Sequence, residues 1–336
     1  MELQAARLVG RVRPSQIVTY RRRESEHPFL DDLLRQEPAP GEALWIVSWG
    51  FEVPGLLRRL RGRPVAYHAH SGGYGFDLPP GTPVLAVSRN TLGYWGDRSP
   101  RSPLLLVPNA LESQRLERGR RPGTAAAPAP ARRPVDVLVQ RRKSSRYVLR
   151  RLVPALRQRG LRVEVQSGWV DDLVELFNAA SVYLYDSADY WRGRGLSEGF
   201  GLPPLEALAC GCVVFSSLNH ALADSLDPGV LGHQIGCGTL EHDLERIEAA
   251  VADPGPWQAD GESLATLLAA SAEQALLGRW AEALKVVDLH WGRCATGARP
   301  LRSSSRLALR WRLRLDRLGR RCGPIGWLAG RLGLTP

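Results

Sequence analysis

The sequence has no long apolar run and no paired cysteine motif. No stretch of its 336 residues approaches the ~18 consecutive apolar residues of a membrane span, and charges interrupt the N-terminal MELQAARLVGRVR, which is unlike a secretory signal. The five cysteines form no C-x-x-C pair and have no histidine at zinc spacing, which indicates reduced thiols. We therefore expect a cytoplasmic protein. Because single cores stop growing near ~250 residues, we also expect two domains.

Lysine is nearly absent, and the positive charge is local. The chain has 43 arginines but only two lysines, Lys143 and Lys285, and its formal net charge is +11. Residues 299–336 hold ten arginines against the single acid Asp316 and carry most of that excess. A nucleic-acid protein more often spreads its basic residues over a folded face, and neither an RNP signature nor a C₂H₂ pattern occurs. We therefore expect no nucleic-acid partner.

Alternating strands and helices predict an α/β protein. Residues 1–111 contain four short β-rich runs bounded by Gly, Pro, Asn or Ser, which favours a parallel sheet. Residues 112–134 fill with Pro, Ala, Arg and Gly and are predicted to be a linker. Residues 135–298 repeat the alternation, and doubly wound sheets bind ligands beyond the carboxyl ends of their strands. The expected strands are residues 43–48, 64–70, 83–88, 103–107, 135–139, 161–166, 181–185 and 212–216, and the expected helices are 147–160, 170–180 and 204–210.

The segment SEGFGLPPLEALACG, residues 197–211, carries the clearest chemistry. Gly199 and Gly201 permit a tight backbone approach. A proline at the start of the following helix costs no hydrogen bond, and Gly211 suits the end of that helix. The unpaired N–H groups of the first turn then point into the loop, which predicts an anion site for a phosphate or diphosphate.

Two carboxylates flank this predicted site, Glu198 before the glycines and Glu206 one turn into the helix. Carboxylates beside a phosphate repel it unless they face another group, and sugar hydroxyls are suitable partners. The pair therefore suggests a nucleotide sugar. Two alternatives stay open on the residues alone: Glu206 complements the helix dipole, and Glu198 is a solvated loop residue.

The same segment resembles the E-x₇-E signature of retaining glycosyltransferases with the GT-B fold, in particular glycosyltransferase family 4. The resemblance covers most of residues 40–250 and includes GWVDDLVELFNAASVYLYDS, PVAYHAHS, VLAVSRNTL and LLLVPNALE. It implies two Rossmann-like domains facing a cleft. An acceptor-side domain would span residues 1–111 and a nucleotide-sugar-binding domain residues 135–298, followed by a basic tail over 299–336.

The resemblance also implies roles. Glu198 would contact the donor sugar's hydroxyls, and Glu206 would hold the ribose diol. An Arg and a Lys after the first strand of the second domain would neutralise the diphosphate. The residues expected to bind sugar and diphosphate through backbone N–H groups are Gly199, Phe200, Gly201 and Leu202.

The cationic clamp departs from the family pattern, because residues 140–146 read QRRKSSR. We favour Arg142 and Lys143, with Arg141 and Arg146 as alternatives. A solvated basic loop is the other interpretation.

His70 follows Pro64 at the spacing at which the family places a histidine on the donor sugar. His68 points to the same side of a strand, so the choice between the two stays open. The family's Gly-Gly loop near the start of the chain is not evident, and residues 49–51 (WGF) are a substitute candidate. Residues 188–196 look inserted before Glu198, and their Tyr190, Trp191 and Arg192 either close over the sugar or pack.

The implied reaction transfers a sugar from a nucleotide-diphosphate sugar, with retention, to a glycan or lipid-linked acceptor. No D-x-D triplet occurs, so we expect neither a metal nor another cofactor. The short first domain leaves an alternative, a catalytically silent GT-B protein that binds a nucleotide sugar or a partner enzyme.

The basic tail combines one helical stripe of apolar residues with arginines opposite. The stripe consists of Leu307, Trp311, Leu315, Leu318, Cys322 and Ile325, while the run LALRWRLRL also alternates with a period of two. If helical, the tail can lie on an anionic membrane surface. The alternative is a tail packed on the first domain or disordered.

Overall fold

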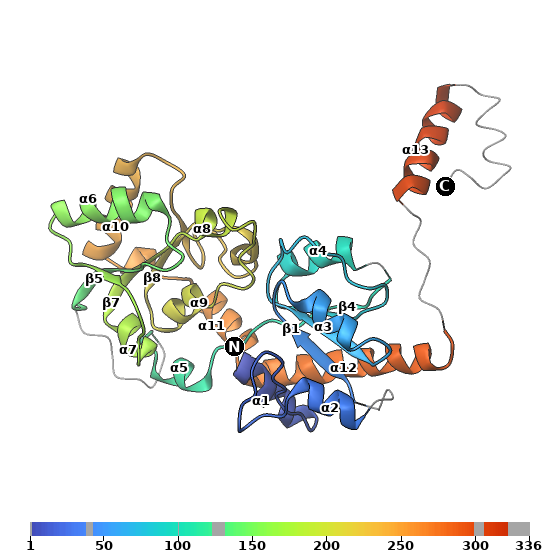
Figure 1. The fold of residues 1–336 in the computed structure, drawn as a ribbon. Coiled ribbons are helices and arrows are strands. Elements are labelled where there is room, and N and C mark those ends of the chain that lie inside the picture. Colours follow the sequence, from blue (N-terminus) through green and yellow to red (C-terminus); the bar gives the residue numbers. More distant parts are fainter. Residues whose placement is uncertain (1, 38–42, 100, 123–131, 299–305, 322–336) are drawn as a thin grey trace. The chain divides into compact units, whose positions relative to one another are not determined.

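The computed structural model describes residues 2–37, 43–99, 101–122, 132–298 and 306–321. It divides into two compact units, Met1–Thr296 and Gly297–Pro336. The larger unit contains two parallel sheets, which we call the first lobe (residues 2–111 and 273–295) and the second lobe (residues 132–270) (Figure 1). The two expected α/β blocks are confirmed.

The first lobe is a four-stranded parallel sheet in the order β1-β2-β3-β4. Its strands match the four runs expected from the sequence. One face of the sheet packs against α2, α3 and α4 around the buried Trp95. The elements are α1 (Glu2–Val12), α2 (Leu30–Gln36), β1 (Trp45–Ser48), α3 (Val53–Arg59), β2 (Val65–Ala69), β3 (Val84–Ala86), α4 (Arg89–Arg98) and β4 (Leu104–Leu106).

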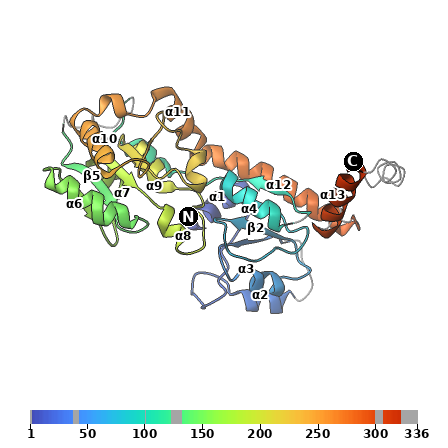
Figure 2. The same ribbon diagram turned by 90° about the horizontal axis from the view of Figure 1, so that it is seen from above.

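The other face of the first sheet is covered from the far end of the chain. Ala66 and Leu85 on this face pack with Leu8 of α1 and with Leu276 and Trp280 of α12 (Glu273–Ala295). Figures 1 and 2 both show α12 running alongside α1. The structure thus differs from the expected boundary at residue 298, because a sheet with one bare apolar face needs a second helical layer.

The second lobe is a five-stranded parallel sheet in the order β6-β5-β7-β8-β9. Alternate residues of its strands face opposite layers: Val137 and Val182 pack against η1, α6 and α10, while Leu138 and Tyr183 pack against α7 and α9. The elements are β5 (Val135–Gln140), η1 (Val148–Leu152), α6 (Val153–Gln158), β6 (Val163–Gln166), α7 (Leu173–Asn178), β7 (Ala180–Tyr185), α8 (Ala188–Arg192), α9 (Leu202–Ala209), β8 (Val213–Ser216), η2 (His220–Asp224), β9 (His233–Gln234), α10 (Leu240–Ala252), η3 (Gly255–Trp257) and α11 (Gly261–Ala270).

Two local features deviate from the expected elements. The helix expected over residues 147–160 begins as a π-helical turn, η1, before α6. Pro154 lies at this junction and cannot donate a backbone hydrogen bond, which accounts for the irregular turn. The expected linker contains a helix, α5 (Ser113–Arg118), and Arg133 donates to the backbone oxygens of Ala180 (2.7 Å) and Cys210 (3.0 Å). The end of the linker at Arg133 is therefore held by the second lobe.

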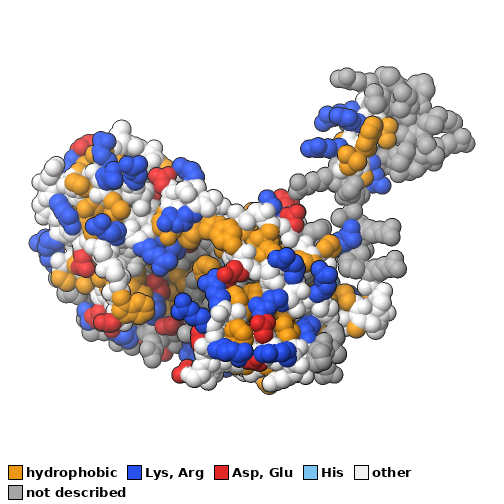
Figure 3. All heavy atoms as spheres, viewed as in Figure 1, with side chains coloured by type: hydrophobic (Ala, Val, Ile, Leu, Met, Phe, Trp, Pro, Cys, Tyr) orange, Lys and Arg blue, Asp and Glu red, His pale blue; other side chains and the backbone are white. Residues whose placement is uncertain are grey.

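The second unit contains α13 (Arg306–Arg321), so the tail is helical over these residues. Leu307 and Trp311 are exposed, and Figure 3 shows an apolar band on α13 with arginine side chains beside it. Cys322 and Ile325 lie outside the described residues, as does the side chain of Leu318. Within the described part of the chain, no helix is long and apolar enough to cross a membrane.

Candidate donor site

The order of the second sheet defines a site. The strands on the two sides of β5, namely β6 and β7, both follow it in the sequence, so the chain reverses its direction of winding there. In such sheets, ligands bind at the carboxyl ends of the strands beside this reversal. Those ends are Gln140 of β5 and Tyr185 of β7.

Glu198 lies at this point and is buried, with 3% of its surface exposed. Its Oε2 accepts hydrogen bonds from the Tyr185 hydroxyl (2.6 Å) and from Trp191 Nε1–H (2.7 Å). Its Oε1 lies 3.4 Å from Lys143 Nζ. The interpretation of Glu198 as a solvated loop residue is therefore wrong.

Lys143 is the member of the predicted clamp that reaches Glu198. Its φ of 67° is in the left-handed region, which costs a non-glycine residue about 1–3 kcal/mol and occurs mostly at functional sites. Arg142 is exposed and makes no ion pair among the described residues. Arg141 and Arg146 line a separate hollow of about 530 Å³ beside η1 and α6. The structure thus joins Lys143 to Glu198 and leaves the three arginines apart from it.

The glycine loop has the conformation that its sequence predicts. Gly201 precedes α9 with φ 85°, and Gly211 follows α9 with φ 73°. Both angles favour glycine. The backbone N–H groups of Gly199, Phe200, Gly201 and Leu202 have no acceptor among the described residues. They lie where the positive end of the α9 dipole lies, which suits an anion.

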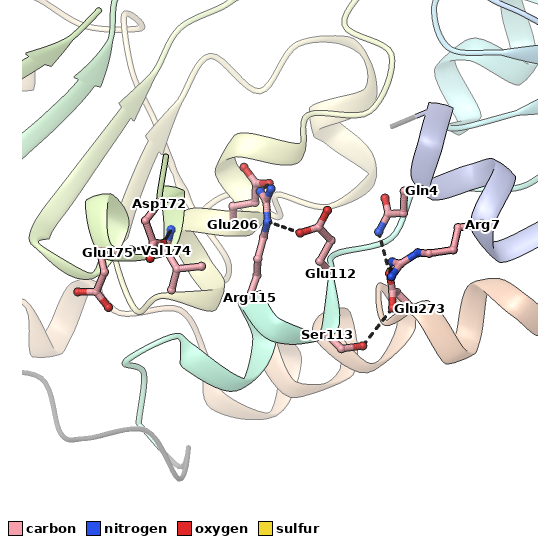
Figure 4. Close-up of polar contacts among 10 residues, drawn as sticks. All are labelled: Gln4, Arg7, Glu112, Ser113, Arg115, Asp172, Val174, Glu175, Glu206 and Glu273. Carbon is pink, nitrogen blue, oxygen red and sulfur yellow. Dashed lines mark hydrogen bonds and ion pairs between the residues drawn. The ribbon is translucent and has the colours of Figure 1, made fainter. Parts of the chain in front are cut away.

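Glu206 is held by a residue that the sequence did not single out. Its carboxylate forms an ion pair with Arg115 of α5, and Arg115 Nε also bonds Glu112 at 3.2 Å (Figure 4). Arg115 lies in the segment interpreted as a linker, where one arginine among many gives no signal. In this structure Glu206 therefore faces a guanidinium group, as well as lying one turn inside α9.

His68 and His70 lie together at the end of β2. Their ring centres are 4.2 Å apart, and His70 stacks on Trp49 at 5.3 Å. They are 3% and 5% exposed, and His68 Nε2 and both ring nitrogens of His70 have no hydrogen-bond partner within the described residues. Burial lowers the pKa of His70 to about 4 and holds that of His68 well below 6.5, so both rings are neutral near pH 7. Neutral, unpartnered imidazoles can bind hydroxyl groups.

The loop after His70 meets the glycine loop. Ser71 Oγ donates to the Ser197 oxygen (2.6 Å), and Gly72 N–H donates to Ser197 Oγ (2.9 Å). A Cβ at Gly199 would overlap the carbonyl oxygen of His70. Gly199 therefore permits the backbones of the two lobes to approach, and the neighbouring Trp49 places residues 49–51 beside this junction.

In the inserted segment, residues 188–196, Trp191 is the member of the predicted trio that contacts Glu198. Trp191 donates to Glu198, whereas Arg192 pairs with Asp189 on the surface, and Tyr190 packs against Arg194. Tyr185 is the other contact that sequence analysis missed. The strand SVYLY did place it at a carboxyl strand end, which is the signal that points to it.

Comparisons with known proteins find one matching family model and several solved structures of similar fold. Residues 152–260 match the family model described as glycosyl transferases group 1. A comparison with curated proteins finds no match.

Solved structures share the fold. A glycosyltransferase from Rickettsia africae ESF-5 is 11% identical with a TM-score of 0.56, covering 81% of this chain and 84% of that chain. HepE from Anabaena, solved in complex with UDP, is 15% identical with a TM-score of 0.50, covering 72% of this chain and 79% of that chain. The GtfA/B complex is 12% identical with a TM-score of 0.51 over 76% of this chain, which spans 59% of that chain. Residues 152–260 of the second lobe are therefore similar to the group 1 glycosyl transferases, and the chain has the GT-B fold.

Proposed function

We propose that this protein is a retaining glycosyltransferase that moves a hexosyl group from a nucleotide-diphosphate sugar to a glycan or lipid-linked acceptor, without a metal ion. The observation that carries the proposal is the Glu198–Lys143 pair at the carboxyl ends of β5 and β7. The pair lies beside four N–H groups that have no acceptor among the described residues. The family match and the UDP bound to the similar HepE support a nucleotide-sugar donor.

Leaving-group charge is the main electrostatic demand of this reaction. When the sugar–phosphate bond breaks, negative charge builds on the diphosphate. Lys143 and the N–H groups of residues 199–202 supply positive charge where that group would lie. In this scheme the leaving phosphate takes the acceptor's proton on the same face of the sugar, as the family resemblance implies, and no protein base is needed.

The two acids and His70 then each bind a different part of the rest of the donor. Glu198 faces the sugar through Oε1, and His70 offers an unpartnered ring nitrogen to a sugar hydroxyl. On donor binding, the ribose diol replaces Arg115 as the partner of Glu206. Arg115 can then face the diphosphate. Contacts such as Ser71–Ser197 close the lobes and limit hydrolysis of the donor.

A nucleotide screen tests this proposal. We expect one of UDP, GDP and ADP to raise the unfolding temperature, and Glu206→Ala to weaken its binding by roughly ten- to a hundred-fold, since a charged hydrogen bond contributes about 1.5–3 kcal/mol. Glu112→Ala, which removes the other partner of Arg115, is the matched control and should bind nearly as wild type. Binding of no nucleoside diphosphate, or equal effects of the two variants, would contradict these roles.

A catalytically silent GT-B protein is the second candidate. The observation that favours it is the engagement of Glu206 by Arg115 and of Glu198 by Trp191 and Tyr185. Binding of a sugar nucleotide without transfer or hydrolysis would support this second function.

We further propose that the protein is cytoplasmic and attaches peripherally to an anionic membrane through residues 299–336. Exposed Leu307 and Trp311 lie one helical turn apart on α13, and Arg310, Arg314 and Arg317 supply positive charge on the same helix. Such attachment suits an enzyme whose acceptor is lipid-linked.

Vesicle co-sedimentation tests the membrane proposal. The full chain should sediment with phosphatidylglycerol vesicles and not with phosphatidylcholine vesicles. Leu307→Ser/Trp311→Ser should reduce this binding at least ten-fold, because the membrane contact of a basic amphipathic helix needs its apolar face. Equal sedimentation of the full chain, this variant and a chain ending at residue 298 would exclude the tail as the anchor.

A further inference from the structure

The two carboxylate oxygens of Glu198 have different environments. Oε2 accepts two hydrogen bonds from neutral donors, Tyr185 and Trp191, at 2.6 and 2.7 Å. Among the described residues, Oε1 has one polar partner, Lys143, whose Nζ is 3.4 Å away. A charge-assisted N–H···O bond is normally about 2.7–2.9 Å long, so this ion pair is incompletely closed.

Trp191 contacts both members of the pair. Its indole N–H bonds Glu198, while Lys143 Nζ lies 4.9 Å from the centre of its ring, in range of a cation–π interaction. The backbone fixes Trp191 in place, since its N–H donates to the Ser187 oxygen and its own oxygen accepts from Leu196, both at 3.1 Å.

Tyr185 is a permanent donor in this arrangement. Burial and the adjacent Glu198 hold the pKa of its hydroxyl well above 10, so the phenol stays protonated at every working pH. Both donors of Glu198 therefore bind Oε2, the oxygen other than the one nearest Lys143.

We propose that Trp191 and Tyr185 are positioning residues that hold Glu198 apart from Lys143. A buried carboxylate without other donors closes onto the nearest cation, because an unsatisfied buried charge is costly. A closed pair would neutralise the lysine that faces the diphosphate and occupy the oxygen that faces the sugar. The proposal rests on the proposed function, and it gives the inserted segment 188–196 a role in that site.

The sequence offers a direct probe, because Lys143 and Lys285 are its only lysines. Acetylation by N-acetoxysuccinimide, followed by mass spectrometry, measures the rate at each amine separately. Lys285 lies on α12 beside Glu282 and serves as the internal reference. Trp191→Phe and Tyr185→Phe should each slow acetylation of Lys143 roughly three- to ten-fold relative to Lys285, since a hydrogen bond to a charged group is removed. Glu198→Gln, which removes the paired charge, should speed it.

Trp169→Phe is the matched control. The Trp169 indole also donates to a carboxylate, that of Asp171 at 2.9 Å, but its side chain is 89% exposed. Equal Lys143 rates in Trp191→Phe and Trp169→Phe, or a faster rate in Trp191→Phe, would overturn the proposal. Thermal unfolding shows whether Trp191→Phe folds. If it does not fold, the Lys143 acetylation rate of Tyr185→Phe tests the proposal instead, with Tyr190→Phe on α8 as its control.

The same assay separates the inference from the proposed function. UDP, GDP or ADP that binds at Lys143 protects it from acetylation in the wild-type protein, and Trp191→Phe should weaken that protection. Slowing by Trp191→Phe without protection by any of the three would refute the donor site and keep the positioning roles. Protection without any effect of Trp191→Phe or Tyr185→Phe would refute the positioning roles alone.

Discussion

Replacing Lys143 by alanine is expected to lower sugar transfer by about 10²- to 10³-fold. Loss of one preorganised group that stabilises developing charge costs this much in other enzymes, and Lys143 is the cation that reaches Glu198. The measurement is the initial rate of nucleotide release from the sugar nucleotide whose base the screen identifies. Lys285→Ala, the only other lysine substitution available, should retain the wild-type rate.

A third variant separates charge from backbone strain. Lys143 has φ 67°, which glycine adopts freely and alanine does not. Lys143→Gly should therefore be more stable to unfolding than Lys143→Ala but equally slow in transfer. If Lys143→Ala kept more than a third of the wild-type rate, or if Lys143→Gly recovered it, the charge of this lysine would not be what drives the reaction.

Stability is expected to fall as the pH drops from about 6.5 to about 4. Burial lowers the pKa of His70 from 6.5 to about 4, so over this interval the unfolded chain binds a proton that the folded chain does not. Stability rises with pH wherever the unfolded state binds more protons, and it therefore decreases on acidification. A shift of this size corresponds to about 3 kcal/mol, reached once the pH is near 4.

Urea unfolding between pH 4 and 7.5 tests this result. His70→Gln should flatten the pH dependence of the free energy of unfolding, whatever its effect at pH 7.5. His68, His220 and His233 also have pKa values lowered by burial. The His70→Gln variant should therefore keep part of the pH dependence of the unfolding free energy. A profile for His70→Gln that is parallel to the wild type would show that His70 titrates normally in the folded protein.

Local patterns located the main elements of the second lobe. The alternation of β-rich runs placed its strands, and the prolines and Gly211 predicted the start and the end of the helix that became α9. Both signals depend on neighbours in the chain, since side-chain periodicity and backbone freedom are local properties. The family resemblance pointed to the basic loop of residues 140–146 and favoured Arg142 and Lys143, and the structure brings Lys143 to Glu198.

Local sequence patterns could not predict contacts between residues that are distant in the chain. Arg115 and Glu206 are 91 positions apart, and Lys143 and Glu198 are 55 apart. Which arginine among 43 pairs with a given acid depends on the packing of α5 against α9, which no short pattern encodes. The assignment of α12 to the first lobe has the same origin, since that helix covers a sheet face made by residues far from it.

The amino-acid sequence by itself determined two parallel α/β blocks, the glycine loop with its two acids and a basic segment with an apolar stripe near the end. The tertiary structure alone decided which partners those acids have: Lys143, Tyr185 and Trp191 for Glu198, and Arg115 for Glu206. The physical reason is that backbone conformation follows from local sterics, whereas the partner of a buried charge is set by which side chains folding brings within hydrogen-bond reach.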